Sequence, residues 1–274
     1  SFLEHEYFGR LFYIYLFLVA IFSISSIIKV SNFEKAMLIF VITFLTYKVN
    51  LFSGYQEILN FSLLILATKI FYEIFNERLP IKKFDSKFFY LFILINSIIW
   101  IKSESTVLIM IFLLSILLLR EINFKIKIVS TLVFVFLLLN KYYIFSFIGL
   151  SHEIQKGNYE YFQIANFFDY VNFSRIMLII KYIFFYLLNN IIYLATTICL
   201  LAMFKFDKKA KFNLFILYML LFSFGFFVAA FLLTSFPLEW VLWTALDRIM
   251  FETSGLFIIL IPLFYDLLKR KKLF

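Results

Sequence analysis

Long apolar runs, separated by short polar segments, dominate the pattern of this chain. A helix needs about 20 apolar residues to cross a bilayer, and fewer where neighbouring helices shelter it. Because backbone groups in lipid must form their hydrogen bonds within the segment, we expect an all-α polytopic transmembrane bundle. By this measure the sequence predicts nine membrane helices, over residues 8–28, 33–49, 56–75, 87–101, 104–119, 124–142, 173–203, 212–236 and 246–268.

The composition supports a membrane protein and excludes several other classes. Of the 274 residues, 64% are hydrophobic, and the mean hydropathy is +0.97, whereas soluble domains are about 45–50% apolar. The net charge of +9 would suggest nucleic acid in a soluble protein, but in a membrane protein basic loops report orientation. We therefore predict membrane lipids as partners and no nucleic acid. We expect no cofactor, and the single cysteine, Cys199, lies in an apolar run where it is expected only to pack.

The distribution of lysine and arginine predicts how the chain is oriented. One set of alternate connections, with the C-terminal tail, holds 17 of these residues, and the other set holds 7. Cytoplasmic loops carry the excess of positive charge, so we expect a cytoplasmic C-terminus and an outer N-terminus. The chain is then a single multi-pass domain, residues 1–274, of a bacterial inner membrane, with residues 150–172 as its longest outer loop. The outer interface would also hold Trp100, Trp240 and Trp243.

Charged residues gather on the predicted outer side, where an ion in hydrocarbon costs several kcal/mol unless it is paired or hydrated. Helix capping would explain Glu57, and Lys102 could extend toward the headgroups. For Arg248, one interpretation is an intrahelical pair with Glu252, because a helix starting near residue 242 places Thr244, Arg248 and Glu252 on one stripe. The functional interpretation is that Arg248 faces a cavity and binds a lipid-linked phosphate through its planar donors, oriented by Asp247 or Glu252.

Three short patches give this outer face a recognisable order. They are "SGYQEI" (53–58), "WIKSEST" (100–106) and "VLWTALDR" (241–248). Together they resemble the motifs of GT-C superfamily membrane glycosyltransferases, in the branch of dolichyl-phosphate-mannose protein mannosyltransferases and aminoarabinose transferases. Two positions depart from that pattern: Glu57 stands where Asp is commoner, and Ser105 replaces a Gly. The matching residues are Gly54, Tyr55, Glu57, Lys102, Glu104, Trp243, Thr244, Asp247 and Arg248.

The resemblance implies a reaction and a role in it for each matching residue. An inverting transferase of this kind moves a hexosyl or pentosyl group from a polyprenyl-phosphate donor to a lipid or glycan acceptor. Arg248 with Lys102 would neutralise the phosphate leaving group, and Glu57 with Glu104 would orient these cations or bind sugar hydroxyls. The remaining site residues that the resemblance implies are Tyr55, Trp243 and Asp247.

The resemblance also implies a general base in the first outer loop, which would lie upstream of Ser1. Within this chain, the candidates for such a base are Glu4, His5 and Glu6, near its start. We therefore expect this chain to be a C-terminal portion that is inactive alone.

Two other functions stay open. An O-antigen ligase or polymerase predicts several arginines in a large outer loop, whereas residues 150–172 contain only Lys156 among basic residues. A transporter or flippase predicts ions near helix midpoints, as at Lys69 and Lys181, and helices that are interrupted in paired positions. No metal site is expected, since His152 and Glu153 are sequence neighbours, which rarely bind one ion together.

Overall fold

The computed structural model describes residues 2–47, 56–77, 85–149, 171–206, 211–234 and 236–271. Side chains are described in the same ranges except those of residues 2–10, 47, 77 and 206. The described chain is all-α and contains no sheet, which confirms the predicted fold class at this level. Gly54, Tyr55 and residues 150–170 lie outside the described residues, as do the side chains of Glu4, His5 and Glu6.

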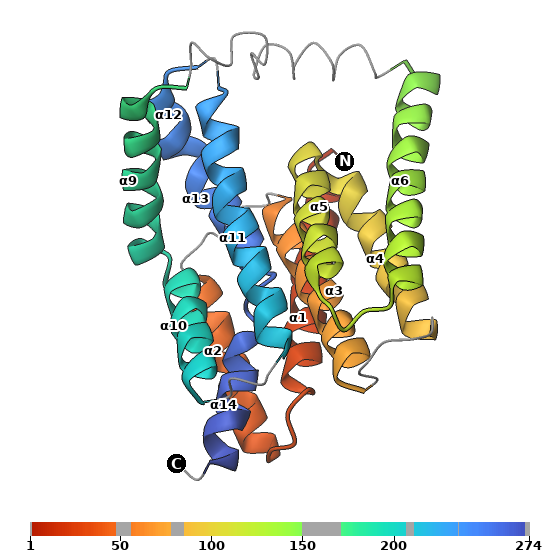
Figure 1. Cartoon of the computed structure of the whole chain (residues 1–274), viewed down its shortest axis with the longest axis vertical. Coiled ribbons are helices and arrows are strands. Elements are labelled where there is room, and N and C mark those ends of the chain that lie inside the picture. The colour runs from red at the N-terminus through yellow and green to blue at the C-terminus, as the bar shows by residue number, and fades with distance from the viewer. Residues whose placement is uncertain are drawn as a thin grey trace.

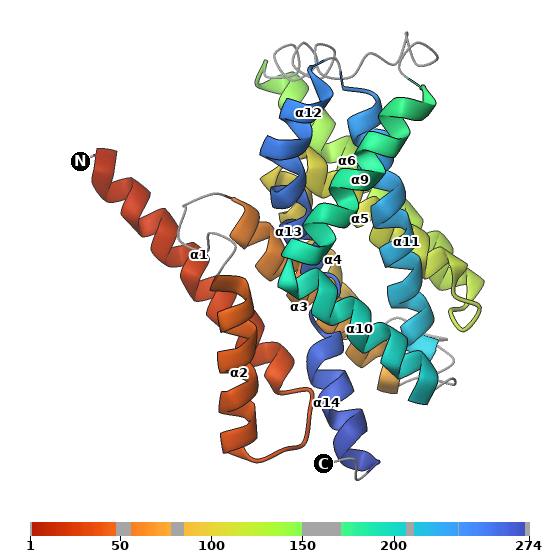
Figure 2. The same cartoon turned by 90° about the vertical axis from the view of Figure 1, so that its left-hand side faces the viewer.

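Each of the nine apolar runs forms a helix or a broken series of helices. Successive runs go alternately down and up the molecule in Figures 1 and 2, and the C-terminus lies at the lower end. The helices are α1 Phe2–Ser25, α2 Asn32–Tyr47, α3 Glu57–Glu77, α4 Ser86–Ile101, α5 Ser103–Leu118, α6 Phe124–Phe147, α9 Phe173–Asn189, α10 Ile191–Phe206, α11 Lys211–Leu232, α12 Leu238–Val241, the π-helix η2 Leu242–Leu246, α13 Asp247–Ser254 and α14 Leu260–Arg270.

Fewer of these helices than predicted are long enough to cross a bilayer alone. Three meet the length and apolarity that a span requires, Glu57–Asn76, Phe124–Phe147 and Lys211–Leu232, and α9 with α10 would make a fourth as one bent span. By contrast, α4 and α5 have 16 residues each, or about 24 Å at 1.5 Å per residue, against a hydrocarbon thickness of about 30 Å. Large apolar side chains are exposed on α6, among them Phe136 and Leu139, as expected of a surface that faces lipid.

The structure has two helices where one is predicted over 173–203, because the backbone breaks at Asn190. There α9 and α10 meet at an angle of 88°. The Asn190 side chain accepts a hydrogen bond from the backbone N–H of Tyr193 at 3.2 Å, which caps the start of α10. Asparagine favours such caps because its short side chain competes with the helical backbone pattern.

The predicted helix 246–268 is also broken, over Gly255–Ile259. Hydrogen bonds between residues three apart replace the α-helical pattern in this stretch, for example from Leu256 N–H to the carbonyl of Thr253 at 3.0 Å. Pro262 has no N–H to donate to the carbonyl of Ile258, and Ile261 N–H donates to that carbonyl instead, at 3.1 Å. Proline in the first turn of α14 therefore starts a new helix rather than continuing the old one.

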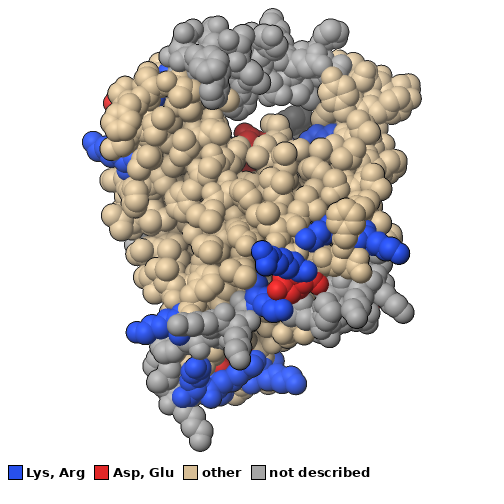
Figure 3. Space-filling model, viewed as in Figure 1, with Lys and Arg blue, Asp and Glu red and all other residues tan. Residues whose placement is uncertain are grey.

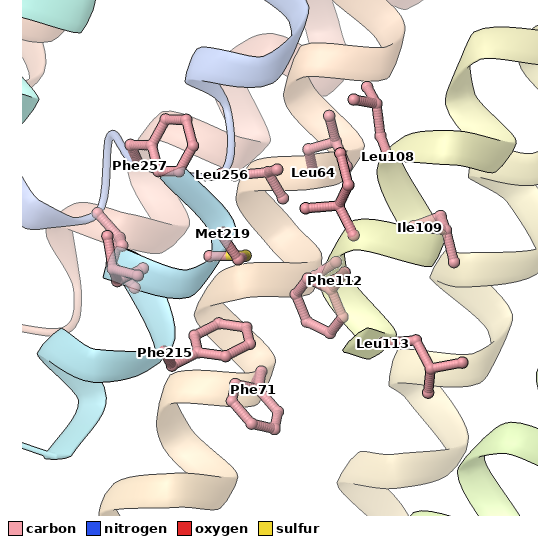
Figure 4. Packing of buried hydrophobic residues seen from close by; sticks show 14 of the residues in the cluster. Leu64, Phe71, Leu108, Ile109, Phe112, Leu113, Phe215, Met219, Leu256 and Phe257 are labelled. Carbon is pink, nitrogen blue, oxygen red and sulfur yellow. The ribbon is translucent and has the colours of Figure 1, made fainter. Parts of the chain in front are cut away.

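Aromatic side chains join the long helices at the centre of the bundle. The rings of Phe71 on α3 and Phe215 on α11 lie 4.4 Å apart, and Phe112 on α5 contacts both edge-on, at 5.5 and 5.3 Å. Figure 4 shows these rings beside Met219 of α11, below Leu256 in the broken segment. Each aromatic pair adds about 0.5–1.5 kcal/mol beyond burial, so this cluster fixes α3, α5 and α11 relative to one another.

At the lower end, Glu34 ties α2 to α14. It forms a capping box with Ser31, whose N–H donates to the carboxylate at 2.8 Å. The Tyr265 hydroxyl and the Lys269 ammonium also donate to Glu34, each at 2.7 Å. The Lys269 hydrogen bond, followed by those of Ser31 and Tyr265, lowers the pKa of Glu34 to about 2. Lysine and arginine crowd this lower half of the surface in Figure 3.

Gly255 allows the broken segment to approach α3, and an alanine there tests that contact. A Cβ on residue 255 would lie 2.6 Å from the backbone oxygen of Phe61, whereas one on Gly225 of α11 would meet nothing within 4 Å. We predict that Gly255→Ala lowers stability by about 1–3 kcal/mol. The matched Gly225→Ala should be neutral or stabilising by up to about 1 kcal/mol. Thermal unfolding in detergent measures both, and equal midpoints would contradict the close approach.

Candidate functional site

Four charged residues from distant parts of the sequence meet at the upper half of the bundle; we call Glu57, Lys102, Arg248 and Glu252 the ion cluster. The Lys102 Nζ donates to Glu57 Oε1 at 2.8 Å and to Glu252 Oε1 at 2.7 Å. The Arg248 Nε lies 3.3 Å from Glu57 Oε1. From α3, Asn60 Nδ2 donates to the other oxygen of Glu252 at 2.9 Å. The cluster therefore links α3, the α4–α5 turn and α13.

Local structure explains how these side chains reach one another. Glu57 is the first residue of α3, and Asn60 follows one turn later on the same face. Lys102 is the extended residue between α4 and α5, with φ −149° and ψ 166°. Because it ends one helix and precedes the next, its side chain leaves a tight helical hairpin toward α3.

A π-helix precedes the arginine. The five residues of η2, Leu242–Leu246, lie between α12 and α13, and π-helical turns rotate the residues that follow relative to an α-helix. Within η2, Thr244 is exposed, and its hydroxyl donates to the carbonyl of Trp240 at 2.9 Å. Arg248 contacts Glu57 of another helix, while Glu252 contacts Lys102 and Asn60.

The four side chains of the ion cluster differ in how much of their surface is exposed. The exposed fraction of the side chain is 3% for Glu252 and 8% for Glu57, 20% for Lys102 and 54% for Arg248. Burial alone would lower the pKa of Lys102, but the charge of Glu252 and the hydrogen bonds that Lys102 donates to both carboxylates outweigh it and raise that pKa. The cluster thus joins two basic and two acidic side chains, with arginine as the member most accessible from outside.

Three buried oxygens near the ion cluster accept or donate no hydrogen bond within the described structure. They are Glu57 Oε2, Asn60 Oδ1 and the hydroxyl of Ser105. Ser105 is fully buried in the first turn of α5, three residues after Lys102. Buried polar groups are normally paired because an unpaired one costs about 1–3 kcal/mol.

The other predicted site residues have different surroundings. Glu104 is exposed on the first turn of α5, and among the described residues no ion pair joins it to the cluster. Asp247 is partly buried at the start of α13. Trp243 is exposed, and its carbonyl accepts a hydrogen bond from the Tyr186 hydroxyl at 3.2 Å. Tyr55 lies outside the described residues. Of the seven predicted residues, the structure brings together Glu57, Lys102 and Arg248.

Two members of the site were not predicted as ligand-binding residues. Sequence spacing predicts Glu252 only as a partner or an orienting group for Arg248, because spacing shows contacts within a helix better than contacts between helices. Asn60 carried a usable signal, since it follows Glu57 by three residues and must share its face of α3. A side-chain amide on that face of an apolar helix needs a hydrogen-bond partner.

Figure 3 shows a hollow at the upper end of the surface, with an acidic and a basic side chain visible in its depth. A separate apolar gap lies between α4, α5 and α6, lined by residues such as Phe88, Phe112 and Phe134, and it does not include the ion cluster. Among the described residues, no group of three or more acidic, histidine or cysteine side chains is placed to hold a metal ion. His152 and Glu153 lie outside that part of the chain.

Replacing Lys102 tests whether the two buried carboxylates depend on it. We predict that Lys102→Met destabilises the protein by about 3–5 kcal/mol, because it leaves Glu57 and Glu252 without their shared counter-ion. Adding Glu252→Gln should recover part of that loss. The control Lys211→Met breaks a pair with Glu121 in which the lysine is 51% exposed, and should cost less than about 1 kcal/mol. Denaturant or thermal unfolding measures all three, and a Lys102→Met variant as stable as the control would refute the shared role.

Comparisons with known proteins do not assign the chain to a family: no family model, no curated protein and no solved structure matches it.

Proposed function

We propose that the protein is a membrane glycosyltransferase that moves a sugar from a polyprenyl-phosphate donor to a lipid or glycan acceptor. The observation that carries the proposal is the ion cluster. Glu57, Lys102 and Arg248 come from three segments far apart in the sequence, one from each motif patch, and their side chains meet. Ions within an apolar bundle are costly and commonly mark a substrate site.

The ion cluster suits a lipid phosphate better than a neutral lipid. Arginine binds phosphate through a planar fork of donors, and more than half of the Arg248 side chain is exposed. Glu57 contacts Arg248 through Nε, which orients the guanidinium. Lys102 lies behind it, held by two carboxylates, and adds positive charge to the same region.

In the proposed reaction, the acceptor oxygen forms a bond to the anomeric carbon as the bond from that carbon to the phosphate oxygen breaks. The acceptor hydroxyl gives up its proton to water or to a general base, and the polyprenyl phosphate leaves with one additional negative charge. Fixed positive groups stabilise such charge most strongly where water is scarce. Arg248 and Lys102 would supply that stabilisation, while Glu57 and Glu252 keep both cations in place.

One observation favours a second candidate, a transporter or flippase. Transporters bind substrate where helices are interrupted in the membrane, and this bundle has two such breaks, at Asn190 and at Gly255–Ile259. They are neighbours, because the hydroxyls of Tyr193 and Thr253 lie 2.8 Å apart. A flippase would move the lipid without breaking its sugar–phosphate bond, which distinguishes the two functions.

Replacing the exposed arginine tests the transferase. In membranes containing the full-length protein and a radiolabelled polyprenyl-phosphate sugar, we predict that Arg248→Ala lowers sugar transfer by about a hundredfold or more. Lys211→Ala is the matched control, because that side chain is equally exposed and pairs with a single glutamate at the opposite end. It should keep wild-type activity.

Two results would count against the proposal. Unchanged transfer by Arg248→Ala at equal protein levels would remove this residue from the mechanism. Movement of intact labelled lipid across proteoliposomes by the wild type, without release of polyprenyl phosphate, would favour the flippase.

A further inference from the structure

The apolar gap between α4, α5 and α6 lies apart from the ion cluster, and its lining limits what it can hold. It is narrow and contains about 370 Å³ of space, a volume that includes its open side. Among the eleven described residues that line it, Ser130 alone has a polar side chain. Such a lining gives polar ligands nothing to bind, because they would lose their hydrogen bonds to water there. A hydrocarbon chain suits both its shape and its chemistry.

The gap borders the surface of the protein that faces lipid. Its outer wall is α6, of which 11% is buried inside the protein, against 67% of the span in α3 and 33% of that in α11. Figure 1 shows α6 at the edge of the bundle. Of the lining residues, Phe92 on α4 and Val133 on α6 are partly exposed, and Leu132 and Phe136 beside them on α6 are exposed. A lipid chain can therefore enter the gap from the side.

Lys127 lies at the lower rim of the gap. It shares a face of α6 with Ser130 and Phe134, which follow it by three and seven residues and line the gap. Its Nζ donates to the carbonyl of Leu117 at 2.6 Å, in the last turn of α5 and next to the lining residue Ile116. An ammonium group has three donors, so this contact uses one of them and positions the others at the rim.

The segment around Lys127 carries an excess of positive charge. Arg120 and Lys125 are exposed at the turn between α5 and α6. The acid of this turn, Glu121, pairs with Lys211 at 3.2 Å, so it does not compensate the other three cations. Basic residues at a membrane surface attract anionic headgroups, by about 1 kcal/mol each. An apolar gap with a basic rim one helical turn below it matches a molecule that joins a hydrocarbon chain to an anion.

We propose that the gap binds one acyl chain of an anionic phospholipid from the leaflet at the lower end, with the lipid phosphate at Lys127. A zwitterionic lipid fits less well, because its own cation would lie among the basic side chains of the rim. The bound chain fills the space between α6 and the hairpin of α4 and α5, and so holds α6 against the bundle. This site does not depend on the proposed sugar transfer.

Photo-crosslinking in lipid nanodiscs tests the headgroup. The probes are phosphatidylglycerol and phosphatidylcholine with the same diazirine-bearing acyl chain, and mass spectrometry identifies the labelled peptides. We expect phosphatidylglycerol to label the lining of the gap about fivefold more than phosphatidylcholine does, as about 1 kcal/mol implies. Lys127→Met should remove this preference, and Lys127→Arg should keep it. The control Lys29→Met removes an exposed lysine between α1 and α2 and should also keep it.

Ser130→Leu tests the gap itself. The larger side chain fills the space that the acyl chain would occupy, so we expect loss of labelling at the gap by both lipids, with thermal stability unchanged or raised. Thr131→Leu is the matched control, since it makes the same kind of change at the next residue of α6, which does not line the gap. It should keep the wild-type labelling. Ser130→Leu retains Lys127, so it tests the site even if Lys127→Met fails to accumulate.

Three results would overturn the lipid site. One is equal labelling of the gap by the two lipids, or a preference that survives Lys127→Met. Another is labelling that Ser130→Leu leaves unchanged, or that spreads evenly over other exposed apolar faces such as those of α2 and α9. The third is an absence of lipid labelling at the gap, as expected if a protein segment or a second copy of the chain covers it. Each leaves the proposed role of Arg248 in sugar transfer untouched.

Discussion

The ammonium group of Lys102, held between two buried carboxylates, is the interaction on which the rest of the site depends. It joins Glu57 at the start of α3 to Glu252 on α13 through hydrogen bonds of 2.8 and 2.7 Å. A buried carboxylate needs such a partner, and within the described structure Glu57 has a second one in Arg248 whereas Glu252 has only Asn60 in addition. Because Glu57 and Glu252 lie 45 and 150 positions from Lys102 in the sequence, this one contact also fixes how the first and last parts of the bundle meet.

The irregular backbone around the cluster serves the same arrangement. The π-helical turn Leu242–Leu246 precedes Arg248, and the tight segment Gly255–Ile259 follows Glu252. Between them, α13 is only eight residues long and continues directly from the π-helical turn with helical backbone at the junction. Close approach at Gly255 then holds α13 against α3. Irregular turns of this kind are frequent at functional sites because they aim particular side chains.

Much of the fold was predictable from apolar periodicity, because a bilayer or a buried bundle demands long apolar helices. The positions at which two predicted helices break were not predictable in this way. Asn190 and Gly255 each end a short polar stretch, "NN" (189–190) and "ETSG" (252–255), but polarity alone does not show a break. Their effects arise from a side-chain cap and a contact with Phe61. In the site, the ions were predictable from their cost in lipid, whereas the partner of each ion was not. Sequence spacing suggested Glu252 for Arg248, but helix packing places Glu57 there.

The most direct test of this account is an experimental structure of the protein in a lipid nanodisc, obtained by electron cryomicroscopy with a bound antibody fragment. It should show the Lys102 ammonium within hydrogen-bonding distance of both Glu57 and Glu252, with the Arg248 guanidinium beside Glu57. A structure in which Arg248 faces lipid and Lys102 contacts neither carboxylate would contradict the central claim.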